Sequence, residues 1–358
     1  WAVSAGTASY YDECRGVTVD SKGNVYGTGY FRGDVDFNGK VISTTGWDGW
    51  IARVNNTGEF DWAMKFGGFD IDVGWDLVAD NYDNLYVTGF YQNLTEFNAT
   101  NLVDTSQSGE RTFYIAYYNV TAEQWDWAKD STGSGLSEPR QLVLENSTNS
   151  VYIAGYNSGI ESWGSGSFTS NPSSTWAGFV VKYNETGKFK WGRSTSGAQC
   201  AFSNCGAVFD NIVTHPDGGV VVGGRFAQTF LDASGTINSG FGDWDLLMKR
   251  YSANGTELWS YFAGGTGPDI LESLSTNQKG QIQFGGKHVE NISFGNDVLI
   301  SNTTSGYYDA FIAQIDGNSN YQWSLSFGGY GNDTVGALLS TSDGSLISGG
   351  DFSGTVFF

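Results

Sequence analysis

An all-β fold built from repeated, four-stranded units is predicted by three observations on this chain of 358 residues. First, a Trp recurs at intervals of 61, 65, 64, 68 and 64 residues, by subtraction of the residue numbers. Second, 51 Gly and 16% aromatic residues are typical of short strands joined by many turns. Third, the same four apolar runs recur in each interval. The recurring residues are Trp1, Trp62, Trp127, Trp191, Trp259 and Trp323.

Four strands are predicted in the second interval, because it holds four runs of β-branched and aromatic residues that are bounded by Gly, Asn and Asp. They cover residues 76–80, 84–91, 113–118 and 124–129, which we name strands a to d. Strands a and b are joined by tight turns rich in Asp, Asn and Gly, which supply positive φ. Strand d carries the Trp and runs into Gly-Gly at 67–68, 264–265 and 328–329. The unit is therefore predicted to be an antiparallel meander.

A Gly recurs at the end of strand b, and we expect it to allow close packing between neighbouring sheets. The Trp of strand d is expected to pack where adjacent sheets meet, since units of this length must bury their apolar faces against one another. The Gly positions are Gly29, Gly89, Gly155, Gly224, Gly286 and Gly350.

Four-stranded sheets repeated in a circle form a β-propeller, and the chain holds material for six such blades in a single domain, 1–358. The repeats span about 1–61, 62–126, 127–190, 191–258, 259–322 and 323–358. The last repeat lacks strand c, and residues 1–4 are expected to close the ring as its strand d. The absent strand indicates either a fragment of a longer chain or a strand supplied by another molecule.

The repeat resembles the SBBP family of bacterial-type seven-bladed β-propeller repeats. The matching segments are Gly23–Gly29, Asn84–Gly89, Asp309–Ala313 and Trp323–Gly329. This resemblance covers the whole chain and implies a propeller fold in a secreted or surface protein. It implies no particular activity, and the seven blades in the family name exceed the six that this chain can form.

Charge and glycosylation motifs predict an extracellular or cell-surface protein. The net charge of −20 argues against nucleic-acid binding, which needs a basic surface. No apolar run is long enough for a membrane span, and a leader peptide is expected either to have been removed or not to be included in this sequence. Asn-x-Ser/Thr motifs indicate N-linked glycans on exposed turns, although Asn and Thr also form turns without them. The ten motifs begin at Asn55, Asn93, Asn98, Asn119, Asn146, Asn184, Asn254, Asn291, Asn302 and Asn332.

The three cysteines fit a secretory context. Cys200 and Cys205 enclose a loop of four residues, and we predict a local disulfide between them. Cys14 is left over, and we expect it to be buried and inert rather than paired with another chain.

An acidic residue recurs ten or eleven positions after the Trp, in the loop between strands d and a. Such residues can cap backbone N–H groups or, if they gather at a channel mouth, bind Ca²⁺. We favour capping over a cation site, and we predict no other cofactor. The residues are Asp12, Asp72, Glu138, Asp269 and Asp333, with Asp210 as the counterpart after an insertion.

No catalytic constellation is evident, because only His215 and His288 are present and no nucleophile elbow or zinc motif occurs. We therefore predict a secreted, N-glycosylated structural or adhesive propeller. The sharper hypothesis is a subunit of an extracellular filament or coat, assembled head to tail through its open sheet edge. One alternative is a carbohydrate-binding or cell-surface recognition module, in which Trp163, Tyr307 or Tyr308 could stack on sugars. A second is a propeller-fold glycan hydrolase or lyase.

Overall fold

The computed structural model describes residues 1–6, 11–97, 100–103, 110–166, 168–170, 176–195, 206–227, 229–231, 237–239, 244–295, 297–301 and 306–357. These residues form strands and turns without helices, so none of them belongs to a helix that could cross a membrane. The chain divides into two compact units. The first holds residues 1–153, 157–171 and 181–192, and the second holds 154–156, 172–180 and 193–358.

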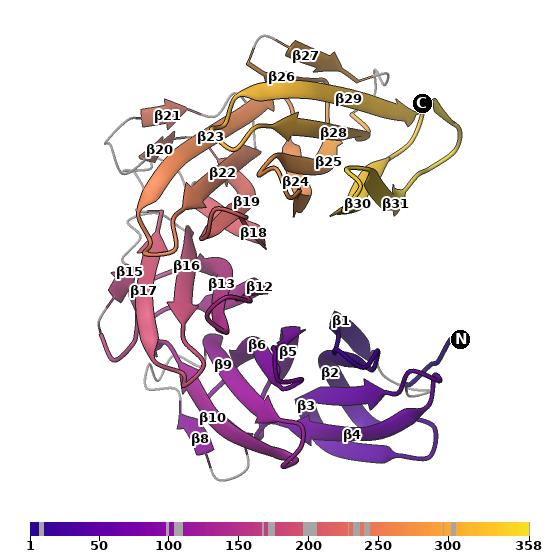
Figure 1. The fold of residues 1–358 in the computed structure, drawn as a ribbon, viewed down its shortest axis with the longest axis vertical. Helices are drawn as coiled ribbons and strands as arrows, with labels where there is room; N and C mark the ends of the chain where they lie inside the picture. Colours follow the sequence, from indigo (N-terminus) through magenta and orange to yellow (C-terminus); the bar gives the residue numbers. More distant parts are fainter. Residues whose placement is uncertain are drawn as a thin grey trace. The chain divides into compact units, whose positions relative to one another are not determined.

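Five antiparallel sheets contain the predicted four-stranded meander, and Figure 1 shows the strands of each lying side by side. Their strands are β1 (Glu13–Val19), β2 (Val25–Asp36), β3 (Val41–Val54) and β4 (Phe60–Phe66); β5 (Asp72–Ala79), β6 (Leu85–Tyr91), β9 (Thr112–Asn119) and β10 (Gln124–Asp130); β12 (Ser137–Glu145), β13 (Ser150–Asn157), β16 (Ala177–Tyr183) and β17 (Phe189–Ser194); β18 (Gly206–Thr214), β19 (Val220–Ala227), β22 (Asp245–Tyr251) and β23 (Glu257–Gly265); β24 (Asp269–Thr276), β25 (Ile282–His288), β28 (Asp309–Ile315) and β29 (Tyr321–Gly329).

A sixth, terminal sheet has only two strands in the described part of the chain, β30 (Thr334–Ser340) and β31 (Leu346–Asp351). Short strands also occupy the connections that the sequence predicted as plain loops, because these segments pair locally or onto strand d. They are β7 (Leu94–Phe97), β8 (Thr100–Val103), β11 (Thr132–Gly133), β14 (Glu161–Trp163), β15 (Phe168–Ser170), β20 (Thr229–Leu231), β21 (Ile237–Ser239), β26 (Asn291–Phe294), β27 (Asp297–Ile300) and β32 (Val356–Phe357). Closure of a ring by residues 1–4 stays a prediction.

The Gly that ends strand b faces strand a of its own sheet, which corrects our expectation of packing between sheets. In the fifth sheet Gly286 pairs with Leu271, directly before a β-bulge at Glu272. A Cβ on Gly286 would overlap the carbonyl oxygen of Ile270, which the bulge brings close. The same pairing with a bulged strand a recurs at Gly29, Gly89, Gly224 and Gly350.

The Gly-Gly pair that ends strand d is explained by the short extra strands. In the fifth interval Gly264 and Gly265 pair with β26, and a Cβ on Gly265 would overlap the carbonyl oxygen of Asn291. Gly329 meets β32 in the same way at Thr355. A side chain at these positions would therefore separate strand d from the segment that covers its end.

Indoles of strand d lie at junctions between sheets, as the sequence predicted. In the first unit the ring of Trp62 lies 5.6 Å from that of Tyr118 in the next sheet. In the second unit Nε1 of Trp259 donates a hydrogen bond to the carbonyl oxygen of Gly317 in the next sheet, at 3.0 Å. Each Trp thus contributes apolar area to the junction.

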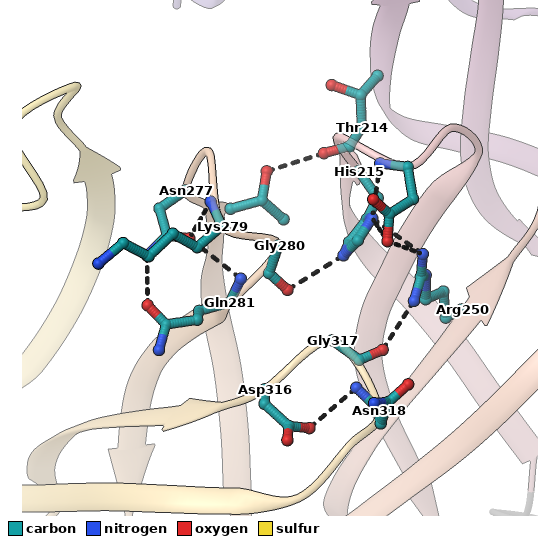
Figure 2. Close-up of polar contacts among 12 residues, drawn as sticks. Thr214, His215, Arg250, Asn277, Lys279, Gly280, Gln281, Asp316, Gly317 and Asn318 are labelled. Carbon is teal, nitrogen blue, oxygen red and sulfur yellow. Dashed lines mark hydrogen bonds and ion pairs between the residues drawn. The ribbon is translucent and has the colours of Figure 1, made fainter.

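A polar network joins the fourth and fifth sheets (Figure 2), and it includes the carbonyl group of Gly317 to which Trp259 donates. Nε2 of His215 lies 3.0 Å from the carbonyl oxygen of Gly280, and Nδ1 lies 2.9 Å from Nη2 of Arg250. Arg250 donates in turn to the carbonyl oxygen of Gly317 at 2.7 Å. Nδ1 also accepts from the backbone N–H of Asp217. These contacts require a neutral imidazole with its proton on Nε2.

The surroundings of His215 favour that neutral form. Burial lowers the pKa of the imidazole and the Arg250 charge lowers it further, against the opposing effects of the Gly280 carbonyl and of Asp217. The network is therefore suited to neutral pH, where His215 can accept from Arg250 and donate to the adjacent sheet.

Candidate functional site

The acidic residues that follow strand d lie close to the Gly-Gly pairs. Oδ2 of Asp72 accepts from the backbone N–H of Gly68 at 2.8 Å, and Oδ2 of Asp333 accepts from Gly329 at 2.9 Å. Both carboxylates are buried. Each carboxylate thus caps a backbone N–H group at the end of strand d, and this contact fixes the connection from strand d to strand a of the next sheet.

A second buried carboxylate, from strand c, lies near two of the acids that follow strand d. Asp48 and Asp72 both lie beside Gly67 in the first unit, and Asp245 lies near Asp269 in the second. Burial, together with Asp48 and Asp70, raises the pKa of Asp72 to about 7. Burial and the nearby Asp245 raise the pKa of Asp269 to about 9.

The remaining sequence-predicted acids have different contacts. Glu138 is buried and forms ion pairs with Arg111 and Arg140. Asp12 lies beside Gly6, and Asp210 pairs with Arg225 at 3.2 Å. Among the described residues no three acidic, His or Cys side chains form a metal-ligating group. Calcium binding stays an untested prediction.

The bulges create a feature that the sequence did not reveal. In four sheets the extra strand-a residue lies beside the residue that follows the strand-b Gly, and this in turn lies beside a residue at or near the start of the segment predicted as strand c. The result is a stacked row of one aromatic or charged side chain from each strand. The rows are Arg15–Tyr30–Trp47, Trp75–Phe90–Arg111, Asp210–Arg225–Trp244 and Glu272–Lys287–Tyr308.

In the first unit these rows join into one basic and aromatic cluster. Trp75 of β5 lies between β1 and β12, with the guanidinium of Arg15 at 4.7 Å and that of Arg140 at 4.6 Å from its ring. Arg111 lies 4.8 Å from the Phe90 ring, which is 6.0 Å from that of Trp75. We call Arg15, Trp75, Arg111 and Arg140 the arginine cluster. It is a preorganised, partly exposed cationic surface.

The terminal sheet offers a different kind of surface. In the described part of the chain β31 pairs only with β30. One face of this sheet packs on the fifth sheet through Val335 and Leu338. The opposite face exposes Leu339 and Ile347, with 60% and 57% of their area accessible. The sheet therefore has both an open edge and an open apolar face.

The eight described glycosylation motifs begin at residues that are exposed or half-buried, and Asn98 and Asn302 lie outside the described residues. Several of these Asn side chains also cap their own turn. Oδ1 of Asn254, for example, accepts from the hydroxyl of Thr256 at 3.0 Å. Turn formation is thus one structural role of these motifs.

The cysteine and sugar-stacking predictions have mixed outcomes. Cys200 and Cys205 lie outside the described residues. Cys14 is exposed rather than buried, because β1 leaves this side of its sheet open around an apolar pocket of about 230 Å³. Trp163 is fully buried against neighbouring rings and offers no face to a sugar, whereas Tyr307 is 45% exposed.

Comparisons with known proteins agree with the repeated four-stranded sheets. A family model described as a β-propeller repeat (SBBP) matches residues 1–30. An uncharacterized WD repeat-containing protein of Acanthamoeba polyphaga mimivirus is 23% identical over the whole chain, which spans 32% of that relative's length. The repeat and its strand order are those of a β-propeller built from repeated blades, and the family match supports this fold.

Two solved structures are similar to most of the chain. A structure titled as the Dos1 propeller has a TM-score of 0.45 at 8% identity, and the match covers 96% of this chain and 69% of that one. Sqt1 from Chaetomium thermophilum has a TM-score of 0.39 at 10% identity, with 94% and 78% covered.

Proposed function

We propose that this chain is a secreted, N-glycosylated propeller with a structural or adhesive role, which associates with further copies of itself by strand addition at β31. The observation that carries the proposal is the open edge of the terminal sheet. Unpaired backbone N–H and C=O groups along a strand accept another strand directly. Such a contact joins two different surfaces, so it can continue from copy to copy into a filament.

The apolar face beside this edge supports the same role. An added strand would place alternate side chains over Leu339 and Ile347 and remove their surface from water. The opposite face of the terminal sheet packs against the fifth sheet, so β31 is already ordered before another strand binds to it. Preorganisation of this kind lowers the entropic cost of association.

Replacing the exposed Ile347 by Lys is expected to abolish self-association, because a charged side chain on an edge strand opposes pairing. Val41→Lys is the matched control, since Val41 is 59% exposed on a different strand, β3. Negative-stain electron microscopy and sedimentation would measure assembly. The proposal predicts filaments or large oligomers for the wild type and for Val41→Lys, and monomers for Ile347→Lys. A wild type that stays monomeric at high concentration would contradict it.

Glycosylation is tested separately after expression in a eukaryotic secretory system. Asn254→Gln is expected to remove one N-linked glycan from the intact mass. Asn318→Gln is expected to leave the glycan count unchanged, because Asn318 is an exposed residue of the corresponding turn in the next sheet but is outside any motif. Identical intact masses before and after enzymatic removal of N-linked glycans would refute the secretory part of the proposal.

A further inference from the structure

We propose that the arginine cluster of the first unit is a binding site for an acidic protein segment, whose Asp and Glu carboxylates it would receive. Arg15, Arg111 and Arg140, together with Arg32 over the Trp47 ring, are four of the eight arginines of the chain. All four lie in the first unit, against the rings of these rows, in a protein with 38 acidic and only 18 basic residues. Such a concentration of guanidinium groups gives an otherwise acidic molecule a local site for anions.

The charge balance of the cluster differs from that of the second unit. There, Arg225 and Lys287 pair with Asp210 and Glu272, the carboxylates at the bulges of their own rows. In the first unit the bulge positions hold Arg15 and Trp75 instead.

Ion pairs within the cluster join three guanidinium groups to two carboxylates. Arg15 pairs with Glu13 at 2.6 Å, while Arg111 and Arg140 share the buried Glu138. A guanidinium group carries five N–H donors in a planar fork, so these pairs orient the arginines of the cluster.

The arginines are positioned and also accessible. The side chains of Arg15, Arg111 and Arg140 are 36%, 44% and 22% exposed, whereas that of Glu138 is only 2% exposed. Stacking on Trp75 and Phe90 restricts the guanidinium planes, so little side-chain entropy is lost when a carboxylate binds. Planar guanidinium groups bind carboxylates through paired hydrogen bonds.

The geometry favours a protein segment over a sugar. Arg15 and Arg140 approach Trp75 from strands on either side of β5, which Figure 1 shows as neighbours. The indole therefore stacks on guanidinium groups instead of offering an open face to a pyranose ring. An extended acidic peptide needs no such face, because its carboxylates can reach the edges of the guanidinium groups.

The test uses a fluorescently labelled octaglutamate peptide and the full chain, with binding followed by anisotropy. Arg15→Ala and Arg140→Ala are each expected to weaken binding roughly tenfold, as the loss of a charge-assisted hydrogen bond entails. Arg225→Ala is the matched control, because Arg225 is also half-exposed and stacks on Trp244 in the second unit. It is expected to bind the peptide like the wild type.

Several outcomes would overturn the proposal. They are no binding of octaglutamate at low salt, an equal loss in Arg225→Ala, or tighter binding of an oligouronic acid of the same charge, which would assign the site to a glycan. Thermal unfolding of each variant separates binding from structure. Arginine variants that lose stability yet bind octaglutamate like the wild type would show that the stacks serve the fold alone. Assembly of Ile347→Lys is scored independently, so the two proposals can fail separately.

Discussion

Replacing Gly286 by Ala is expected to lower the free energy of unfolding by about 3 kcal/mol or more. The new methyl group would overlap the carbonyl oxygen of Ile270, which belongs to the backbone of the adjacent strand and cannot rotate away. Relief would require opening the bulge at Glu272, and with it the pairing of β24 with β25. Chemical denaturation followed by tryptophan fluorescence measures the change.

Gly349→Ala is the matched control for this substitution. Gly349 lies one position before the corresponding Gly of the terminal sheet, and a Cβ there would meet no atom within 4 Å. Its replacement is expected to be neutral or to stabilise by up to about 1 kcal/mol through the unfolded chain. Equal losses in the two variants would show that any side chain replacing a strand-b Gly is harmful and that the bulge is not the cause.

Replacing Asp269 by Asn is expected to remove a loss of stability that the wild type shows as pH rises from about 4 to 9. Burial and the neighbouring Asp245 raise the pKa of Asp269 to about 9, from 3.8 in the unfolded chain. The folded state therefore binds the proton more tightly than the unfolded state does. Stability from this group is fully present below about pH 4 and is lost as pH rises towards 9. Asn is neutral at every pH and close in shape.

Thermal unfolding at pH 5 and pH 9.5 tests this expectation. The midpoint temperature of unfolding of the wild type should be lower at pH 9.5 than at pH 5. The decrease should be several degrees smaller in Asp269→Asn. Asp34→Asn, at an exposed position of β2, should behave like the wild type. The same pH dependence in the wild type and in Asp269→Asn would contradict the assigned pKa.

The strands were predictable because their side-chain patterns are local. The predicted strand at 113–118 corresponds to β9, Thr112–Asn119, and the predicted strand at 124–129 to β10, Gln124–Asp130. The recurrence of Gly at the end of strand b was equally visible. The strand-a bulge that this Gly contacts was not visible, because a β-bulge depends on the register between two strands and no particular residue type marks it.

The arginine cluster could not be predicted for a related reason. Arg15, Trp75 and Arg140 differ in chemistry and come from separate sheets, so no repeated residue type marks them. The regularity is positional: in the first two sheets the bulge residue lies beside the residue after a recurring Gly. With the register known, those positions could have been aligned. The extra strands against Gly-Gly were missed because the segments that form them vary in length between repeats.

The bulge in strand a has a consequence for how this molecule can diversify. The pairing on both sides of it is held by the backbone and by a Gly, so the side chain of the additional residue has little part in folding. In the described bulges that residue is Arg15, Trp75, Asp210, Glu272 and Gly336. The same fold thus offers a set of equivalent positions at which evolution or protein engineering can place acidic, basic or aromatic side chains without disturbing the core.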